Sequence, residues 1–237
     1  MAKIMDCKGA SDLAKRLLEK VVDENPNILD ILDSNYILHL ENTSKVAGET
    51  YDDSIDNYPR LKKYLVREEL VLSGGLHDIG RPYNKDQVFH EPRGARYLEE
   101  NGLELGVADN IVNVYRIAQM FRSHFVVAEQ FADDENAEAR AEFEPLDSAL
   151  LIPRTWQEAI ITYADMSNTK GERVPYQERI DGIKKKYAPS SKAAQFNPTL
   201  AKAMEKGVER VFEVCNRVQR LRDGKLTEQE IRRYGFL

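Results

Sequence analysis

The sequence predicts an all-α protein. Nearly every segment of the 237-residue chain repeats apolar residues at spacings of three and four, which is the period of an amphipathic helix. No stretch shows the strict apolar–polar alternation of a half-buried strand, and there is no internal repeat or low-complexity run. The length suits one large domain, or an ordinary domain with an appendage. We expect a helical domain over 1–190 and a C-terminal helical extension over 191–237.

The first third of the chain predicts three helices. The first ends at Asn25-Pro26, the second covers about 28–55, and the third begins near residue 60, after the break Asn57-Tyr58-Pro59. Between Leu70 and Gly75 the third helix is apolar or small on every side, so we expect it to be buried all round. The stripe of the first helix consists of Leu13, Leu17, Leu18, Val21 and Val22.

The rest of the chain predicts further helices joined by polar segments. The expected order is a short helix ending at Asn101-Gly102, a helix over about 107–125, an exposed acidic connection over 133–144, a helix over about 155–165, a loop over 168–175, a charged helix over 176–187 and a linker over 189–197. A last long helix begins with Asn197 as its cap and Pro198 in its first turn. Its apolar stripe, Leu200 to Leu221, needs a partner, either the domain core or a second subunit in a homodimer. Thr227 and Glu230 form a capping box for a terminal turn.

The composition limits the classes of function. The net charge of −6 argues against a general nucleic-acid binder, which carries a basic face. Two cysteines, Cys7 and Cys215, make no disulfide framework, and a reducing compartment is the simplest interpretation. No apolar run reaches the roughly 18 residues of a membrane span, and the first residues lack the core of a signal peptide. We therefore expect a cytoplasmic protein with no membrane partner.

The segment Ser73–Arg81, SGGLHDIGR, carries the strongest chemical signal. His77 and Asp78 are adjacent at the end of a helical pattern, and an imidazole with a carboxylate suits a borderline or hard divalent cation. Gly80 then lets the backbone turn away from the helix directly after these two residues. A single His-Asp pair is common by chance, so the distribution of the other histidines matters.

The remaining candidate ligands lie where helices end. The chain has four histidines in all, and besides His77 they are His39, His90 and His124. Asp165 is a carboxylate within the apolar segment ITYAD, and a buried ionised carboxylate is costly unless it is paired or bound to a metal. Taken singly, each has an ordinary explanation, such as a structural histidine or a helix-capping aspartate. Taken together, they indicate a shared metal site.

Four separated motifs make the resemblance specific. GGLHDIGR, FHEPRGARYL, FRSHF and ITYADMSN, in that order, resemble the HD-domain metal-dependent phosphohydrolase superfamily over about residues 28–187. The resemblance implies an HD-domain-like helical bundle that hydrolyses phosphate esters or anhydrides, of a nucleotide or another small phosphorylated metabolite, by metal-activated water. His90 in the pattern H-x-P-x-G-A, followed by His124, is most similar to the branch with a second metal position. That branch includes symmetrical dinucleoside-tetraphosphate hydrolases and cyclic-dinucleotide phosphodiesterases, although the Gly-Tyr-Pro signature of the latter is absent.

The resemblance also implies a set of metal ligands. A first ion would be held by His77, Asp78 and Asp165, with Asn42 or His39 completing the set. A second ion would use Asp78 as a bridge, together with His90 and His124. Such mixed donors accept manganese, iron, cobalt, nickel or zinc.

Cationic side chains near the His-Asp pair could contact an anionic substrate. Arg81 is the main candidate to neutralise charge on the phosphoryl group, which would make it a catalytic residue beside Asp78. Lys85 and Arg93 are weaker candidates for substrate binding, because surface cations are usually just solvated.

Asn42 departs from the family pattern. The first ligand of the family precedes a Val-Ala pair by four residues, and here that place, before Val46-Ala47, holds Asn42. The position could use Asn42 as a weak neutral ligand, use His39 from roughly the same helix face, or be degenerate. We expect a degenerate or weakened position, since aligning the motif on His39 would leave Val46 out of phase.

Three functional hypotheses follow from these patterns. The first is a metal-dependent phosphohydrolase. The second is a catalytically weakened relative that acts as a nucleotide- or phosphate-binding module, which Asn42 favours. The third is a helical scaffold that dimerises through its last long helix, with its polar cluster unoccupied.

Overall fold

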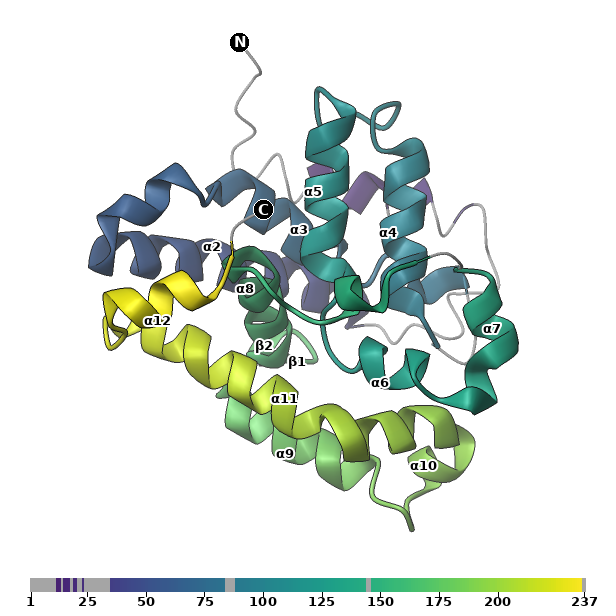
Figure 1. Ribbon diagram of the computed structural model, residues 1–237. Coiled ribbons are helices and arrows are strands. Elements are labelled where there is room, and N and C mark those ends of the chain that lie inside the picture. Colours follow the sequence, from purple (N-terminus) through teal and green to yellow (C-terminus); the bar gives the residue numbers. More distant parts are fainter. Residues whose placement is uncertain are drawn as a thin grey trace.

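The described part of the chain is mostly helical, as the periodicity predicts (Figure 1). A computed structural model describes residues 12–13, 15–17, 19–20, 23, 35–83, 88–143 and 146–235. Among these residues, no helix combines the length and the apolar character needed to cross a membrane. Of the predicted first helix, the structure describes residues 12–13, 15–17, 19–20 and 23, which are all helical, and Leu13 and Leu17 of its stripe are buried in the core. Leu18, Val21 and Val22 of the stripe lie outside the described residues.

The described part of the chain is divided into α-helices, short 3₁₀ segments (η) and one small hairpin. In order they are α2 (Tyr36–Asn57), η2 (Pro59–Lys63), α3 (Arg67–Leu76), η3 (Arg81–Tyr83), α4 (His90–Asn101), α5 (Ile111–Arg122), α6 (Val127–Phe131), η4 (Asp134–Asn136), α7 (Ala137–Ala141), η5 (Ser148–Leu151), α8 (Trp156–Met166), β1 (Asn168–Thr169), β2 (Glu172–Arg173), α9 (Tyr176–Lys186), α10 (Lys192–Phe196), α11 (Pro198–Arg222) and α12 (Glu228–Arg233).

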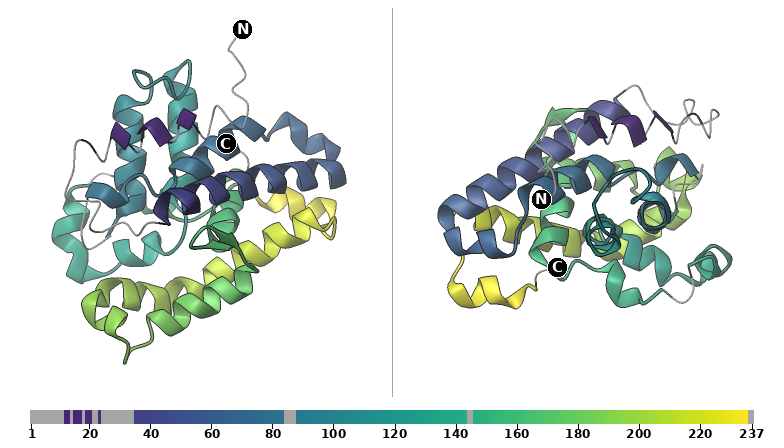
Figure 2. Two further views of the ribbon diagram at one scale, coloured as in Figure 1. Left: turned by 180° about the vertical axis from the view of Figure 1, so that it is seen from behind. Right: turned by 90° about the horizontal axis from the view of Figure 1, so that it is seen from above.

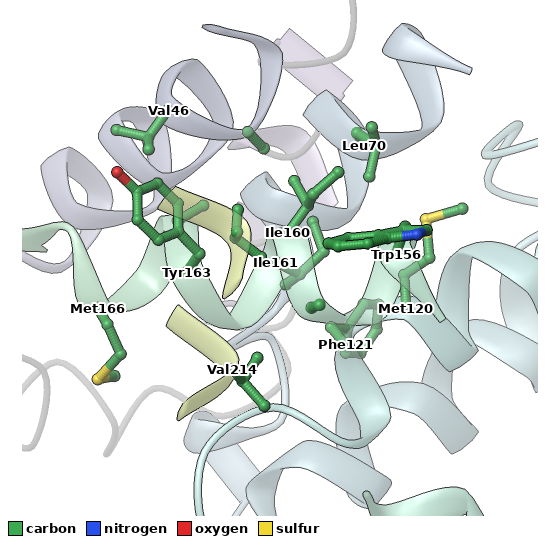
Figure 3. Close-up of a cluster of buried hydrophobic side chains, with 14 of the residues drawn as sticks. Val46, Leu70, Met120, Phe121, Trp156, Ile160, Ile161, Tyr163, Met166 and Val214 are labelled. Carbon is green, nitrogen blue, oxygen red and sulfur yellow. The ribbon is translucent and has the colours of Figure 1, made fainter. Parts of the chain in front are cut away.

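The α8 helix is the centre of the fold. All of its residues are buried, and it contacts α2, α3, α5, α9 and α11. Figure 3 shows its side chains, among them Trp156, Ile160 and Ile161, packed among apolar residues of the surrounding helices. A capping box between Thr155 and Glu158 begins the helix. Because α8 is enclosed on every side, Asp165 near its C-terminal end is brought into the interior of the protein.

The α11 helix packs on this core. Its apolar face, including Val211, Cys215 and Val218, belongs to the same hydrophobic cluster as α8. The left view of Figure 2 shows α11 running along the bottom of the molecule, with α9 beside it. Asn197 caps it through the backbone N–H of Leu200, as the sequence predicts. The predicted capping box of Thr227 and Glu230 is also present at α12.

Two segments differ from the expectation of plain loops. The segment 168–175 contains a short antiparallel hairpin, β1–β2, whose two-residue strands are too short to show an alternating pattern in the sequence. Lys170 and Gly171 form its turn with positive φ values of 49° and 81°, as two-residue hairpin loops require. The predicted linker 189–197 contains the one-turn helix α10, capped by Ser191.

A close approach of two backbones assembles the polar centre. Gly80 follows the end of α3 and lies against the first turn of α4, where a Cβ atom would stand only 1.9 Å from the carbonyl oxygen of His90. Only glycine fits such an approach. Gly80 therefore allows the residues just before it, His77 and Asp78, to lie beside His90.

Candidate metal centre

Six polar side chains, all buried except the partly buried His39, converge between the ends of the helices. They come from distant parts of the sequence, and each lies at or near a helix end or on the inner face of a helix. The donors are His39 of α2, His77 and Asp78 after α3, His90 at the start of α4, His124 just after α5, and Asp165 of α8. Four imidazoles and two carboxylates are a donor set that divalent transition metals accept.

The first part of the cluster surrounds one point. Nε2 of His39 lies 3.2 Å from Nε2 of His77 and 3.2 Å from Oδ1 of Asp165. Nε2 of His77 lies 3.6 Å from the same Asp165 oxygen and 3.6 Å from Oδ2 of Asp78. His39 Nε2 and Asp78 Oδ2 are 3.8 Å apart.

These separations match the edges of a coordination polyhedron. With metal–ligand distances of about 2.1 Å, neighbouring ligand atoms lie about 3.0 Å apart in an octahedron and about 3.4 Å apart in a tetrahedron. The five distances among His39, His77, Asp78 and Asp165 fall near or slightly above this range. His39, His77 and Asp165 could therefore ligate one divalent ion with little movement, and Oδ2 of Asp78 lies near the two histidines of this group.

The second oxygen of Asp78 faces a different pair of histidines. Its Oδ1 atom lies 3.0 Å from Nε2 of His90 and 3.6 Å from Nε2 of His124. Asp78 thus presents one oxygen to each half of the cluster, as a bridging carboxylate does between two ions.

The histidines are held by acceptors on their Nδ1 atoms. Nδ1 of His77 lies 2.8 Å from the carbonyl oxygen of Gly74, and Nδ1 of His124 lies 2.6 Å from that of Phe121. Nδ1 of His39 lies 2.5 Å from the side-chain oxygen of Asn168. Acceptors at these places fix the proton on Nδ1 and leave the Nε2 lone pair directed into the cluster, which is how metal-ligating histidines are oriented.

The two aspartates are held ionised. Burial by itself raises the pKa of Asp78, but the charges of Arg81 and His77 outweigh it and hold the pKa well below the usual value. Burial likewise opposes ionisation of Asp165, and hydrogen bonds with His39 and His77 hold its pKa well below the usual value. Both carboxylates are therefore in the form that can bind a cation.

The histidines titrate differently from one another in the metal-free chain. Burial lowers the pKa of His77 below its ordinary value. Burial also acts against the charge on His124, but the hydrogen bond with Asp78 and the charge of Glu91 raise its pKa to about 9. The pKa of His39 is raised because the hydrogen bond and charge of Asp165 outweigh its burial. Protons on His124 and His39 would have to leave when a metal binds.

Unusual backbone conformations flank two of the ligands. Phe89, which precedes His90, has φ of 57°, and Phe125, which follows His124, has φ of 62°. Bulky residues rarely adopt this left-handed region, and such strain concentrates at functional sites. A buried hydrogen bond also holds the backbone of Asp78 in place, since the hydroxyl of Tyr36 donates to the carbonyl oxygen of Asp78 at 2.6 Å.

The cluster is enclosed on one side and open on the other. The side chains of His77, Asp78 and His124 are at most 2% exposed, whereas those of His39 and Arg81 are 12% and 33% exposed. Nε of Arg81 lies 2.5 Å from Oδ2 of Asp78. Water or a substrate would therefore reach the cluster beside His39 and Arg81.

The structure places His39, rather than Asn42, in the first half of the cluster. The side-chain nitrogen of Asn42 donates to the carbonyl oxygens of Leu38 and Gly171. His39 precedes Val46 by seven residues, which is nearly two helical turns, so the two residues lie on the same side of α2. His39, Thr43 and Val46 accordingly line one inward face of α2, and Asn42 lies at its margin.

Of the two weaker cationic candidates, the structure describes only Arg93. Lys85 lies outside the described residues. Arg93 forms an ion pair with Glu142, with Nη2 and Oε2 2.8 Å apart, and its guanidinium lies over the ring of Phe143. These contacts direct Arg93 toward the segment that follows α7.

Two further residues belong to the centre although the sequence analysis did not single them out. Asn168 is fully buried, and besides contacting His39 it donates to the hydroxyl of Thr43 at 2.6 Å. Glu91 is fully buried next to His90 and can share an ion with His90 and His124. The signal for both was their place within the quoted motifs, since Asn168 ends ITYADMSN and Glu91 follows the histidine of FHEPRGARYL.

Comparison with known proteins adds no identity to this geometry. No family model, curated protein or solved structure matches the chain.

Proposed function

We propose that this protein is a metal-dependent hydrolase of phosphate esters or anhydrides, acting on a nucleotide or another small phosphorylated metabolite. The observation that carries the proposal is the convergence of His39, His77, Asp78 and Asp165 at spacings that suit one ion. The reaction class comes from the resemblance of the four motifs to HD-domain phosphohydrolases. The resemblance implies His77, Asp78 and Asp165 as ligands, and the same three side chains lie close together in the cluster.

The side chains of the centre have distinct roles in this proposal. A bound divalent ion would supply Lewis acidity and would lower the pKa of a coordinated water, which is the nucleophile that hydrolysis of a phosphate ester requires. His39, His77, Asp78 and Asp165 would hold that ion, and Asn168 keeps the Nε2 atom of His39 directed into the cluster. His90 and His124 face the other oxygen of Asp78 and would hold a second ion.

Arg81 is the residue for the substrate anion. Its guanidinium lies at the open side of the cluster and next to Asp78. There it can neutralise charge on the phosphoryl oxygens as the bond to the leaving group breaks. The overall charge of −6 does not prevent this, because the ion and Arg81 reverse the local field.

The binding-module hypothesis depended on a missing first ligand at Asn42. The presence of His39 beside His77 and Asp165 supports the hydrolase instead, because these three side chains can hold an ion without Asn42.

Elemental analysis combined with an activity screen tests the proposal. The purified chain should contain a transition metal, and with manganese, iron, cobalt, nickel or zinc it should hydrolyse members of a panel of nucleotides, dinucleotides and simple phosphate esters. Asp165→Asn should lose both metal and turnover. Asp181→Asn, the same change on the exposed face of α9, is the matched control and should keep both. A metal-free wild type that stays inactive after loading with each metal would contradict the proposal.

A further inference from the structure

Glu91 is a buried ionisable side chain next to the histidines of the second half of the cluster. It occupies the first turn of α4 and is 0% exposed. Within the described part of the chain, neither of its carboxylate oxygens accepts a hydrogen bond. Buried carboxylates are costly unless a cation or several hydrogen-bond donors compensate them. The position therefore lacks the compensation that the other two carboxylates of the centre receive.

The surroundings of Glu91 contain metal donors. One ligand atom from each of Glu91, His90 and His124 lies within 4.8 Å of the others. Glu91 Oε2 is 3.3 Å from Nδ1 of His90, which is close but does not satisfy hydrogen-bond geometry. His90 and His124 also face the Oδ1 atom of Asp78. An ion between the two histidines would find Glu91 within reach.

We infer that Glu91 is a protein ligand of a second divalent ion, which it binds together with His90 and His124. The inference rests on the proposed function, since it concerns a second ion beside the one held by His39, His77, Asp78 and Asp165. A direct bond to the ion would compensate the buried charge of Glu91. It would also give the second position an anionic donor of its own, in addition to the oxygen of Asp78 that it shares with the first.

One other role for Glu91 fits the same atoms and must be separated from ligation. Glu91 could act only through His90, by accepting a hydrogen bond from Nδ1 as Gly74, Phe121 and Asn168 do for the other three histidines. Glu91→Gln distinguishes the two roles. The glutamine side chain has almost the same shape and still offers an acceptor to Nδ1, but it is neutral and a much poorer ligand.

The experiment counts ions with manganese as the probe. Wild type, Glu91→Gln and Glu99→Gln are stripped with a chelator, loaded with excess manganese, dialysed and analysed for metal per chain. Glu99→Gln is the matched control, because it makes the same change on the same helix at a residue paired with Arg122. Electron paramagnetic resonance then reports whether two manganese ions are magnetically coupled. Circular dichroism of each stripped chain verifies that it is folded.

The outcomes separate the inference from the proposed function. We expect two coupled ions in wild type and Glu99→Gln, and one uncoupled ion in Glu91→Gln, with the second site weakened at least about tenfold. Two ions retained in Glu91→Gln would overturn the inference in favour of a role through His90. A single ion in wild type would overturn the inference and leave the proposed function standing, whereas no ion in wild type would overturn both. If Glu91→Gln does not fold, Glu91→Asp replaces it. That variant keeps the charge but shortens its reach, and an unchanged second site would likewise count against direct ligation.

Discussion

Replacing His39 tests which residue of α2 completes the first metal position. His39→Ala removes one of four converging donor atoms, and it leaves His77, Asp78 and Asp165 in place. Asn42→Ala is the matched control, one turn further along the same helix. The sequence motif points to Asn42 for this ligand position, whereas in the structure His39 lies beside His77 and Asp165. The two variants should therefore differ in metal affinity.

The expected magnitude follows from the number of ligands. A four-ligand transition-metal site in a protein contributes roughly 10–16 kcal/mol of binding free energy, so one ligand is worth about 3 kcal/mol. This corresponds to an affinity loss of roughly 100-fold for His39→Ala. Asn42→Ala loses only hydrogen bonds to the carbonyl oxygens of Leu38 and Gly171, which costs about 1 kcal/mol of folding stability and should change metal affinity little.

The assay is competition between the protein and a chromogenic chelator for zinc or manganese. Circular dichroism of the metal-free chains confirms that both variants are folded. The reasoning is refuted if Asn42→Ala weakens metal binding as much as His39→Ala does, or if His39→Ala binds as tightly as wild type. A further variant, Asn42→His, should give no large gain in affinity, because the position it would fill already has an imidazole.

Three further predictions concern the histidine anchor, the pH dependence and the last long helix. Asn168→Ala removes the acceptor for Nδ1 of His39, so it should weaken metal binding by roughly 10–100-fold in the same competition assay. Asn168→Asp keeps an acceptor and should retain most of the affinity. Equal losses of affinity in the two variants would contradict this role of Asn168. In the metal-free chain the pKa of His124 is raised from 6.5 to about 9. Protonated His124 should therefore add of order 3 kcal/mol to the free energy of unfolding below pH 6.5, and this contribution is lost as the pH rises through 9. The Tm should fall over that interval, with His39 acting in the same direction, and His124→Gln should flatten the decline; an unchanged slope would refute the assignment. A chain truncated after Ser190 loses α11 and with it part of the core, so it should show no cooperative thermal transition. A cooperative transition in this truncated chain would mean that α11 is only an appendage.

The helical class and most helix positions could be predicted because they depend on local patterns. The burial of Leu70–Gly75 in α3 and the caps at Thr227 and Asn197 follow from residues close together in sequence. The hairpin β1–β2 could not be predicted, since two-residue strands leave no periodic signal and depend on the turn at Lys170 and Gly171.

The candidate ligands could be found in the sequence, but their grouping could not. His77 and Asp78 are adjacent, whereas His39 is brought to them only by the packing of α2 against α3 and α8. The motif spacing pointed to Asn42 because it counted residues from Val46. In the structure, the helical period puts His39 on the inward face of α2 and Asn42 at its margin.

The supporting residues were missed for a similar reason. Asn168 and Glu91 carry no distinctive spacing, and each becomes interpretable only when its buried neighbours are known. Asn168 contacts His39, which lies 129 residues earlier in the sequence. Glu91 lies near His124, although most of α4 and all of α5 come between them in the sequence.

The most direct test of the metal centre is anomalous diffraction from crystals of the protein grown with manganese or zinc. The account predicts an anomalous peak within bonding distance of His39, His77, Asp78 and Asp165. Crystals in which that point carries no peak, although the metal binds elsewhere on the protein, would contradict it.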